Sequence, residues 1–497
     1  MGIRRDDIPS SQRAPIVIEA LSPHRLHGTI SRLAGEQGVS RQTIYQMAAV
    51  GQARLTEALA PGRHGPQPPQ TTIRVDRNRL VRGSVVLTEV GVSQGDIPVC
   101  LEELLDTPVS PSWVNAQLAQ LEAAAEKVND RWRPAIGEGL SGDEISSNGL
   151  PNLLVVGNES MYVYALTRQP DCGGDTWAGV LLDGPDCPQF ASDAGTGLAA
   201  GVKLAQVTPH QLDWDHLLRP VWGQVARLED QAYAALEACQ ARAAQFGQAQ
   251  TPKRLAHHLA AWERLTAEAQ VKVERDDQFH QLATQIDAEF GLIDPQTGDV
   301  RDPQRGTENL GQVGRQLQNW GGVIYTKLSG YLVNLAAGLF SYAPGLARAL
   351  QPLQERWGES ALRAVMRLWQ WEADAKRRPR TWGERQRHQR QWEAGLDEVV
   401  ALIGLEPLAQ VWAEATQVLE RVWRGSILAE CVNSLLRPRL QGRKHTDQGC
   451  LELFRFLHNV HPFHRGKPAG HSPAQLVGME VPEDPLTLLN LAPKVSI

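Results

Sequence analysis

The stretch that decides the fold is SGDEISSNGLPNLLVVGNESMYVYAL, residues 141–166. Two β-rich runs within it, 152–159 and 161–167, follow one another almost without a break, which is typical of a hairpin. An acidic pair, Asp143 and Glu144, stands just ahead of them. Carboxylates at such a position either decorate the surface or provide the first ligands of a metal site, and the rest of the chain has to decide between the two.

The residues after this hairpin extend the pattern into an α/β core. Residues 175–182 indicate a helix, and 188–202 a short strand that ends at Asp193 and is followed by a helix. The order strand, strand, strand, helix, strand, helix is that of a ribonuclease-H-like core, in which a hairpin is joined to a parallel strand through a helical crossover. We expect Asp143 on the first strand. Because neighbouring strand residues face opposite sides, only one of Asp143 and Glu144 can point at a common site, and we choose Asp143.

Length and composition are those of a globular protein with several domains. The chain has 497 residues, 42% of them hydrophobic, and a formal net charge of −6. No run of about 18 apolar residues and no export signal is visible. The six cysteines form no CxxC pair, which argues against a disulfide framework and a cysteine zinc site. We expect a cytoplasmic protein without a membrane segment.

Positive charge is concentrated in two segments although the total is negative. Residues 361–390 and residues 421–467 each hold nine Lys or Arg against three acids. Such clusters either form solvated helix faces or line a phosphate-binding surface.

Near the N-terminus, residues 30–51 predict a helix, a tight turn and a second helix. Gly38 can take the positive φ that the turn needs, and Ser40 is a good N-cap for the second helix. We predict a DNA-binding helix-turn-helix within residues 1–60, with a plain helical hairpin as the alternative. The first turn of its second helix carries three residues of types that hydrogen-bond base edges in a major groove: Arg41, Gln42 and Thr43.

The rest of the chain divides by composition. Proline and glycine mark a linker, the strand signals are confined to one region, and a long helical stretch interrupts that region. The second helical module resembles a helix-turn-helix or serves as a packing element. The expected segments are a linker at 61–73, the second helical module at 74–135, the first part of the core at 136–203, an all-helical insertion at 204–415, the last part of the core at 416–475 and a C-terminal tail at 476–497.

A late helix supplies a third acid. In the run 424–444, Glu430, Asn433 and Arg437 recur at three- and four-residue spacing and therefore share one helix face. Further on, histidines near Cys450 lack a paired zinc-ligand spacing and are expected at the surface or in contact with phosphate. They are His458, His461, His464 and His471.

Three motifs together make the chain resemble the DDE transposase/integrase superfamily of bacterial insertion sequences. They are GDEISSNGLPNLLVVGNESMYVYAL, FASDAGTGLAAGV, and AECVNSLLRPRLQGRK with HNVHPFHRGKPAGHSPAQL. The resemblance implies an α/β ribonuclease-H-like catalytic core with a large all-α insertion, preceded by helix-turn-helix modules. Its three acids, which would hold two Mg²⁺ ions with Mn²⁺ able to substitute, are Asp143, Asp193 and Glu430.

The function implied is that of a DNA transposase, which binds transposon ends in double-stranded DNA and cuts and joins strands as a homodimer. Two divalent ions held by carboxylates can activate the attacking oxygen and stabilise the leaving one, and hard cations prefer oxygen ligands. The late polar residues expected to contact DNA are Asn433, Arg437, Arg443 and Lys444. Because the stretch before Asp143 is glycine-rich, a domesticated or inactive DNA-binding protein of the same fold remains an alternative, as does a structure-specific nuclease.

Overall fold

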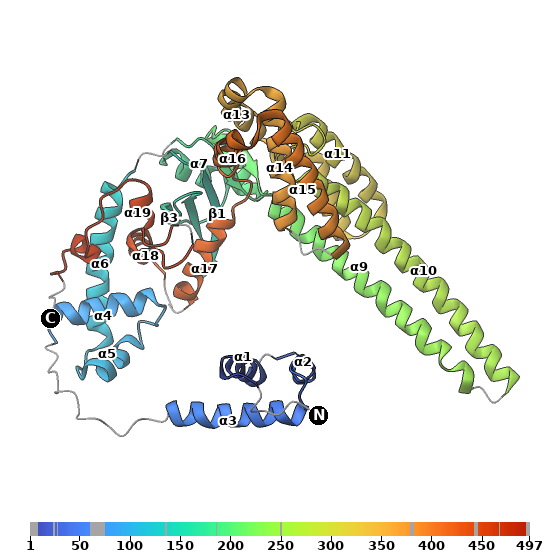
Figure 1. Ribbon diagram of the computed structural model, residues 1–497. Helices are drawn as coiled ribbons and strands as arrows, with labels where there is room; N and C mark the ends of the chain where they lie inside the picture. Colours follow the sequence, from blue (N-terminus) through green and yellow to red (C-terminus); the bar gives the residue numbers. More distant parts are fainter. Residues whose placement is uncertain are drawn as a thin grey trace. The chain divides into compact units, whose positions relative to one another are not determined.

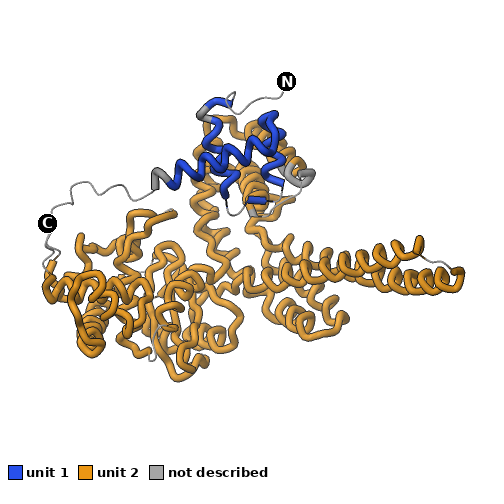
Figure 2. The backbone as a smooth tube through the Cα atoms, turned by 90° about the horizontal axis from the view of Figure 1, so that it is seen from below, with its two compact units in different colours: residues 1–74 blue, residues 75–497 orange. Residues whose placement is uncertain are grey.

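The computed structural model describes residues 8–22, 25–26, 28–59, 75–134, 137–184, 186–248, 251–377, 382–441, 446–466 and 468–493. The chain divides into two compact units, Met1–Arg74 and Val75–Ile497 (Figure 2). The linker expected at 61–73 lies outside the described residues.

The described part of the first unit is helical. Its elements are α1 (Ser10–Leu21), α2 (Thr29–Glu36) and α3 (Arg41–Leu59). Gly38, at φ +64°, lies in the turn between α2 and α3, and the Ser40 hydroxyl accepts a hydrogen bond from the Thr43 N–H at 3.1 Å. Both predictions for this turn are confirmed. Apolar residues of all three helices bury one another in a small core, including Ile16, Ala20, Ile30, Leu33, Ile44 and Met47.

The described part of the second unit contains one mixed sheet with strand order β3-β2-β1-β4-β5. Its strands are β1 (Leu140–Ser147), β2 (Leu150–Gly157), β3 (Val163–Arg168), β4 (Phe190–Ser192) and β5 (His210–Leu212). β2 pairs antiparallel with β1 and β3, whereas β4 pairs parallel with β1 and β5. The hairpin and the predicted order of the first four strands are confirmed. β5 was not expected, because it lies in the stretch assigned to the helical insertion.

Helices cover both faces of this sheet (Figure 1). On one face, α7 (Gly174–Leu182) and α8 (Thr196–Leu204) share a core with Leu153 and Phe190. On the other face, α17 (Ile427–Gln441) and α18 (Gln448–Val460) share a core with Leu154. β2 therefore reads LLVV at consecutive positions, because a strand buried on both faces has no polar side.

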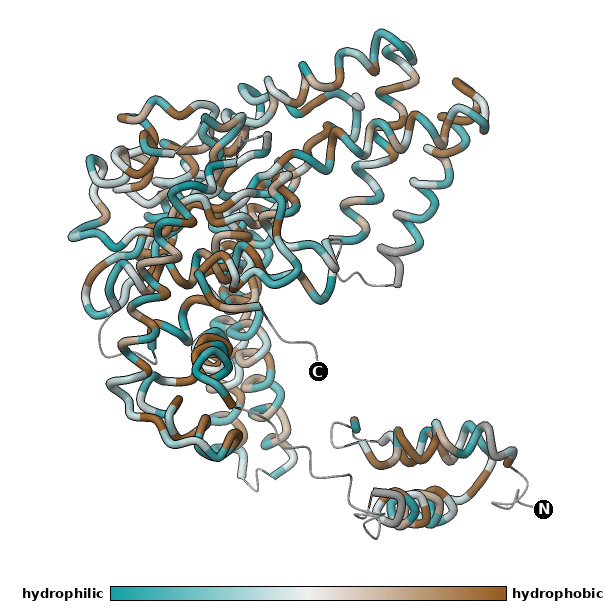
Figure 3. Tube along the Cα trace, turned by 90° about the vertical axis from the view of Figure 1, so that its left-hand side faces the viewer, coloured by the Kyte–Doolittle hydropathy of each residue, from teal (hydrophilic) through white to brown (hydrophobic). Residues whose placement is uncertain are grey.

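A large helical region separates β5 from α17. Its helices are α9 (Trp214–Ala243), α10 (Pro252–Ala288), α11 (Pro303–Leu317), α12 (Val323–Asn334), α13 (Ala343–Trp357), α14 (Glu359–Arg377), α15 (Trp382–Ile403) and α16 (Leu405–Leu419). Hydrophobic and hydrophilic residues alternate along the helices, as amphipathic packing requires (Figure 3). The two ends of this region lie side by side, because the Trp214 N–H donates to the Arg424 carbonyl at 3.0 Å.

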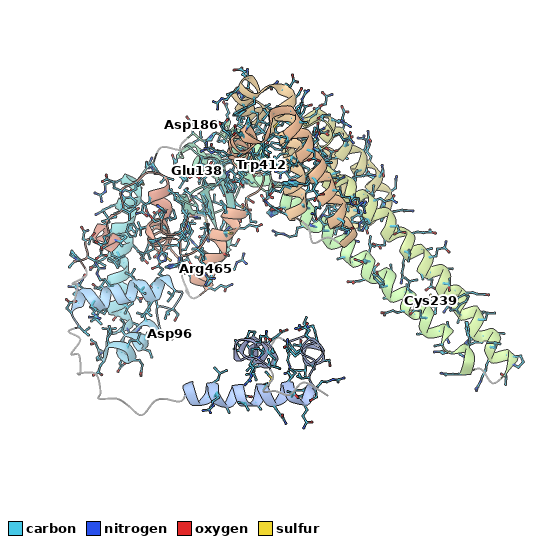
Figure 4. All side chains as sticks on the ribbon, viewed as in Figure 1. Asp96, Glu138, Asp186, Cys239, Trp412 and Arg465 are labelled. Carbon is cyan, nitrogen blue, oxygen red and sulfur yellow. The ribbon has the colours of Figure 1, made fainter. Side chains whose placement is uncertain are left out.

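The two longest helices, α9 and α10, pack along each other as a hairpin (Figure 1). Buried residues on α9 recur at alternating spacings of four and three, which is the heptad pattern of a coiled coil. These residues are Val221, Val225, Leu228, Ala232, Ala235 and Cys239. Cys239 marks the part of this seam that lies away from the sheet (Figure 4).

The segments expected as a second helical module and a C-terminal tail share one core. Helices α4 (Arg77–Glu89), α5 (Ile97–Leu105) and α6 (Pro111–Arg131) pack with α18 and with the 3₁₀ helix Pro485–Leu489. The apolar faces of α4 and α6 are completed by side chains from far along the chain, such as Phe456 and Leu489. The predicted cap of α6 is confirmed, since the Ser110 hydroxyl accepts from the Trp113 N–H and Pro111 is the first helical residue.

Among the described residues, no single helix is both long and apolar enough to cross a membrane. Two pairs of bent helices meet that test only when each pair is taken together: Val323–Asn334 with Ala336–Trp357, and Gln389–Ile403 with Leu405–Leu419. Apolar residues of the first pair, such as Leu328 and Leu346, are buried in the core of the helical region.

Candidate active site

Asp143 and Asp193 come from neighbouring parallel strands. Asp143 lies within β1, and Asp193 directly follows the last residue of β4. Ser141 pairs with Ala191 across these strands, and the charge of Asp193 raises the pKa of Asp143, so the two carboxylates lie near each other. The carboxylate of Asp193 is held by the Gly195 N–H, which donates to it at 2.9 Å.

The register of β1 also separates Asp143 from Glu144. Asp143 pairs with Leu154, which belongs to the core under α17, whereas Glu144 pairs with Leu153, which belongs to the core under α7. Paired residues of antiparallel strands share a face. Asp143 therefore faces α17, as the choice between the two acids assumed, and Glu144 faces the opposite helices.

Helix α17 contacts Asp143 through Asn433. The Asn433 side-chain amide donates to an Asp143 carboxylate oxygen at 2.8 Å, and the other oxygen accepts the Glu144 N–H at 2.8 Å. Asn433 is only 3% exposed, so it offers no surface to DNA. Asn433 was expected to contact DNA; its position on the inner face of α17 makes it a partner of Asp143.

Glu430 lies one turn earlier on α17 and contacts α9. Its carboxylate lies 3.4 Å from His216 Nε2 and 3.3 Å from the Arg219 guanidinium. Its side chain is about one-third exposed. Glu430 is thus held at the junction of α17 and α9 by two groups that can carry positive charge.

Asp213 holds the N-terminal ends of both α9 and α17. It is 1% exposed and accepts hydrogen bonds from the N–H groups of Asp215 and His216, as the N-cap of α9. It also accepts both the N–H and the hydroxyl of Ser426, each at 2.7 Å, just before α17. The second ring nitrogen of His216 lies 3.4 Å from Asp213, so His216 bridges Asp213 and Glu430.

The carboxylates influence one another electrostatically. Burial raises the pKa of Asp143, and the charges of Asp193 and Glu430 raise it further, against the hydrogen bonds from Asn433 and the Glu144 N–H. Burial likewise raises the pKa of Glu144, and Asp193 and Asp143 add to that shift. A cation bound near these carboxylates would stabilise their ionised forms.

The acids do not form a preassembled ligand set. Among the described residues, no group of three His, Cys, Asp or Glu side chains stands close enough to hold a metal ion as it is. Asp143 and Asp193 come from neighbouring strands, whereas Glu430 is held toward α9 by His216 and Arg219. The charges of Asp193 and Glu430 both act on Asp143, so the three predicted acids lie in one region, where Glu430 is engaged with His216 and Arg219.

The predicted basic residues fall in different surroundings. Arg437 is exposed on α17, whereas Arg443 and Lys444 lie outside the described residues. In the first unit, Arg41 and Gln42 are exposed in the first turn of α3, and Thr43 is half-buried.

Sequence reasoning missed the contribution of α9. The run DWDH, residues 213–216, directly follows β5 and supplies both Asp213 and His216. The signal that could have identified them is the group of two acids and a histidine immediately after the short run HQL.

A scan against protein-family models finds no matching family, and a search of curated proteins finds no matching relative. The class of this protein is therefore argued from the sheet, the carboxylates and their partners.

Proposed function

We propose that the protein is a DNA transposase of the DDE type, which cuts and joins DNA strands with the help of Mg²⁺. The acids assigned to the metal are Asp143, Asp193 and Glu430. The observation that carries the proposal is the proximity of Asp143 and Asp193, from neighbouring parallel strands, with Asn433 of α17 orienting Asp143.

The sheet supports a ribonuclease-H-like core. Three antiparallel strands continue into two parallel strands, with helices on both faces. The acids occupy the first strand, the end of the fourth strand and a helix near the end of the chain, as the resemblance to DDE transposases implies. The helical region between the second and third acids corresponds to the insertion found in some members of that superfamily.

The donor set fits a hard cation. Carboxylate and amide oxygens are the ligands that Mg²⁺ takes from proteins. The side-chain oxygen of Asn433 is buried and has no hydrogen-bond partner among the described residues, so an oxygen donor stands unused beside Asp143. Burial raises the pKa of Asp143 and the charges of Asp193 and Glu430 raise it further, so a bound cation would stabilise its ionised form.

The residues of the chain would position the reaction. Bound divalent ions supply the activation of a water or 3′-hydroxyl and the stabilisation of the leaving oxygen. Asn433 fixes the carboxylate of Asp143, the Gly195 N–H fixes that of Asp193, and His216 with Arg219 fixes Glu430. Such outer partners orient ligands and tune their basicity.

DNA recognition is assigned to the first unit. Arg41 and Gln42 are exposed at the start of α3, where a recognition helix contacts base edges. The Ser40 cap and the turn at Gly38 hold that end of the helix in place.

The test is nicking of supercoiled plasmid DNA by the purified protein in Mg²⁺. Asp193→Asn should reduce the rate by at least about 100-fold, since removing one charged ligand weakens metal binding and transition-state stabilisation together. Asp183→Asn, at an exposed acid after α7, is the matched control. Equal nicking by Asp193→Asn and wild type would refute the site. Joining of the cut 3′ ends to a second DNA molecule distinguishes a transposase from a nuclease.

A further inference from the structure

A cavity of about 580 Å³ lies in the helical region, between α9, α10 and the start of α12. Three cationic residues line it, one from each helix, and no acidic residue does. They are Arg227, Arg275 and Lys327. The charged residues that line the cavity are therefore all positive, although the protein as a whole carries a net charge of −6.

Two of these cations are available to a ligand. Arg227 and Lys327 are exposed, and neither forms an ion pair with any residue that the structure describes. Charged side chains that converge on one cavity without acidic partners repel one another, and an anion bound between them removes that repulsion.

The third cation, Arg275, is held in a fixed position. Its guanidinium lies 5.4 Å from the centre of the Trp320 ring and 5.5 Å from that of Tyr325, and it donates to the Trp320 carbonyl at 3.3 Å. Trp320 and Tyr325 pack on each other, with ring centroids 5.3 Å apart. A guanidinium stacked in this way keeps further N–H donors for a planar or tetrahedral oxyanion.

Backbone N–H groups add to the positive lining. Gly321 and Gly322 have φ of +66° and +96° with extended ψ, a conformation that glycine alone adopts readily. They lead into α12, whose N-terminus lines the cavity and receives no side-chain cap. The uncapped N–H groups of a helix N-terminus attract anions.

We propose that this cavity binds a phosphate group of a DNA strand. The oxygens of a tetrahedral phosphate match the lining of the cavity, which combines the fixed Arg275, the exposed Arg227 and Lys327, and uncapped backbone N–H groups. The choice of DNA as the carrier rests on the proposed function, whereas the phosphate chemistry follows from the lining of the cavity. The helical region then makes its own contact with DNA, separate from the carboxylates of the sheet.

One test maps arginine accessibility in the full-length wild-type protein. Phenylglyoxal modification is followed residue by residue by mass spectrometry, with no addition, with sodium pyrophosphate, and with a short DNA duplex in EDTA. We expect both ligands to slow modification of Arg227 by at least about fivefold, since an anion bound to the guanidinium blocks its reaction with phenylglyoxal. Arg264, whose side chain is 74% exposed on α10, is the internal control and should react at the same rate throughout.

A second test measures the salt dependence of duplex binding in EDTA. Arg227→Gln/Lys327→Gln should weaken binding about tenfold and lower the slope of log K against log salt by about one, because about one counterion is released per phosphate contact and the cavity holds one phosphate. Arg264→Gln should leave the slope unchanged.

The outcomes separate the parts of the proposal. Protection by both ligands together with the reduced slope supports it. Protection by pyrophosphate without protection by the duplex supports a phosphate site but overturns DNA as the carrier. Absence of protection by either ligand, with an unchanged slope, overturns the proposal. Neither readout involves strand cleavage, so a failed nicking test of the proposed function leaves these results interpretable, and the reverse also holds.

Discussion

The side chain of Asn433 donates a hydrogen bond to Asp143 at 2.8 Å, across 290 positions of sequence. The bond joins α17 to the central strand of the sheet and determines how the Asp143 carboxylate is presented. Because Asn433 is buried, its effect on the reaction passes through Asp143.

Asn433→Ala should therefore reduce Mg²⁺-dependent nicking by about 10- to 100-fold, the usual effect of losing a residue that orients a metal ligand. Circular dichroism and the midpoint of urea unfolding show whether the variant is folded. Ser434→Ala, at the exposed neighbouring position, is the control and should retain wild-type activity. An Asn433→Ala protein that nicks at the wild-type rate would show that Asp143 needs no such support.

Asp213→Ala should lower the free energy of unfolding by about 3 kcal/mol, since it removes a helix cap and leaves the buried donors of Ser426 unpaired. Asp302→Ala offers a matched comparison. Asp302 caps α11 through the N–H groups of Gln304 and Arg305 but is exposed, so only about 1 kcal/mol should be lost. Urea titration of both variants measures the difference, and equal losses would contradict the anchoring role of Asp213.

His458 should make the protein sensitive to acid. Burial lowers its pKa to about 4, and its ring nitrogen bonds to the Met161 carbonyl. Between the usual pKa of about 6.5 and pH 4 the unfolded chain takes up a proton that the folded chain does not. The free energy of unfolding therefore falls by about 1.4 kcal/mol per pH unit as the pH drops through that window.

His458→Gln should remove this contribution and flatten the stability curve below pH 6.5. Denaturant midpoints measured from pH 7.5 to pH 4.5 provide the slope. His210, whose pKa burial also lowers to about 4, leaves a residual dependence in the variant. His464→Gln, at an exposed histidine, should keep the wild-type slope. Parallel curves for wild type and His458→Gln would contradict the prediction.

Asp484→Ala should lower the free energy of unfolding by about 3 kcal/mol, because the buried guanidinium of Arg82 loses its carboxylate partner and keeps only the Ala492 carbonyl as acceptor among the described residues. Arg82 is 7% exposed and bonds to both Asp484 oxygens, at 2.9 and 2.7 Å. Glu483→Ala, at the exposed neighbour, should have little effect. A small loss in Asp484→Ala, measured by urea unfolding, would mean that the last segment contributes little to the fold.

Arg41→Ala/Gln42→Ala should abolish sequence preference in DNA binding while leaving weak binding to arbitrary sequence, because base-edge contacts contribute about 1–3 kcal/mol each. The comparison uses a sequence selected from a random library and a scrambled duplex. Gln52→Ala, exposed three turns later on α3, should keep the preference. Retention of the preference by the double variant would move recognition to another surface.

Local signals were sufficient for the hairpin and the caps. The consecutive apolar residues of β2, the short break between β2 and β3, and the Ser110–Pro111 pair are each determined by neighbours in sequence. Asp193 was assigned correctly to the end of β4 because a short apolar run stops there and glycines follow.

Contacts between segments far apart in the chain could not be predicted from such local signals. β5 has three residues and is held by pairing with β4 and by the Gln211 side chain, which donates to the Leu339 carbonyl. The approach of His216 to Glu430 likewise depends on the return of the chain after the whole helical region. The burial of Asn433 follows from its contact with β1, which its helical spacing alone does not reveal.

The helical region leaves the sheet after Asp213 and comes back at Ser426, whose backbone and hydroxyl bond to that same aspartate. Its two ends thus meet like the ends of a surface loop, and lengthening a loop costs free energy only logarithmically. The α/β layers should then tolerate changes in the length of the helical region so long as this clasp is kept, together with the contacts of His216, Arg219 and Leu339. A different helical region could therefore be joined to the same α/β layers at Asp213 and Ser426.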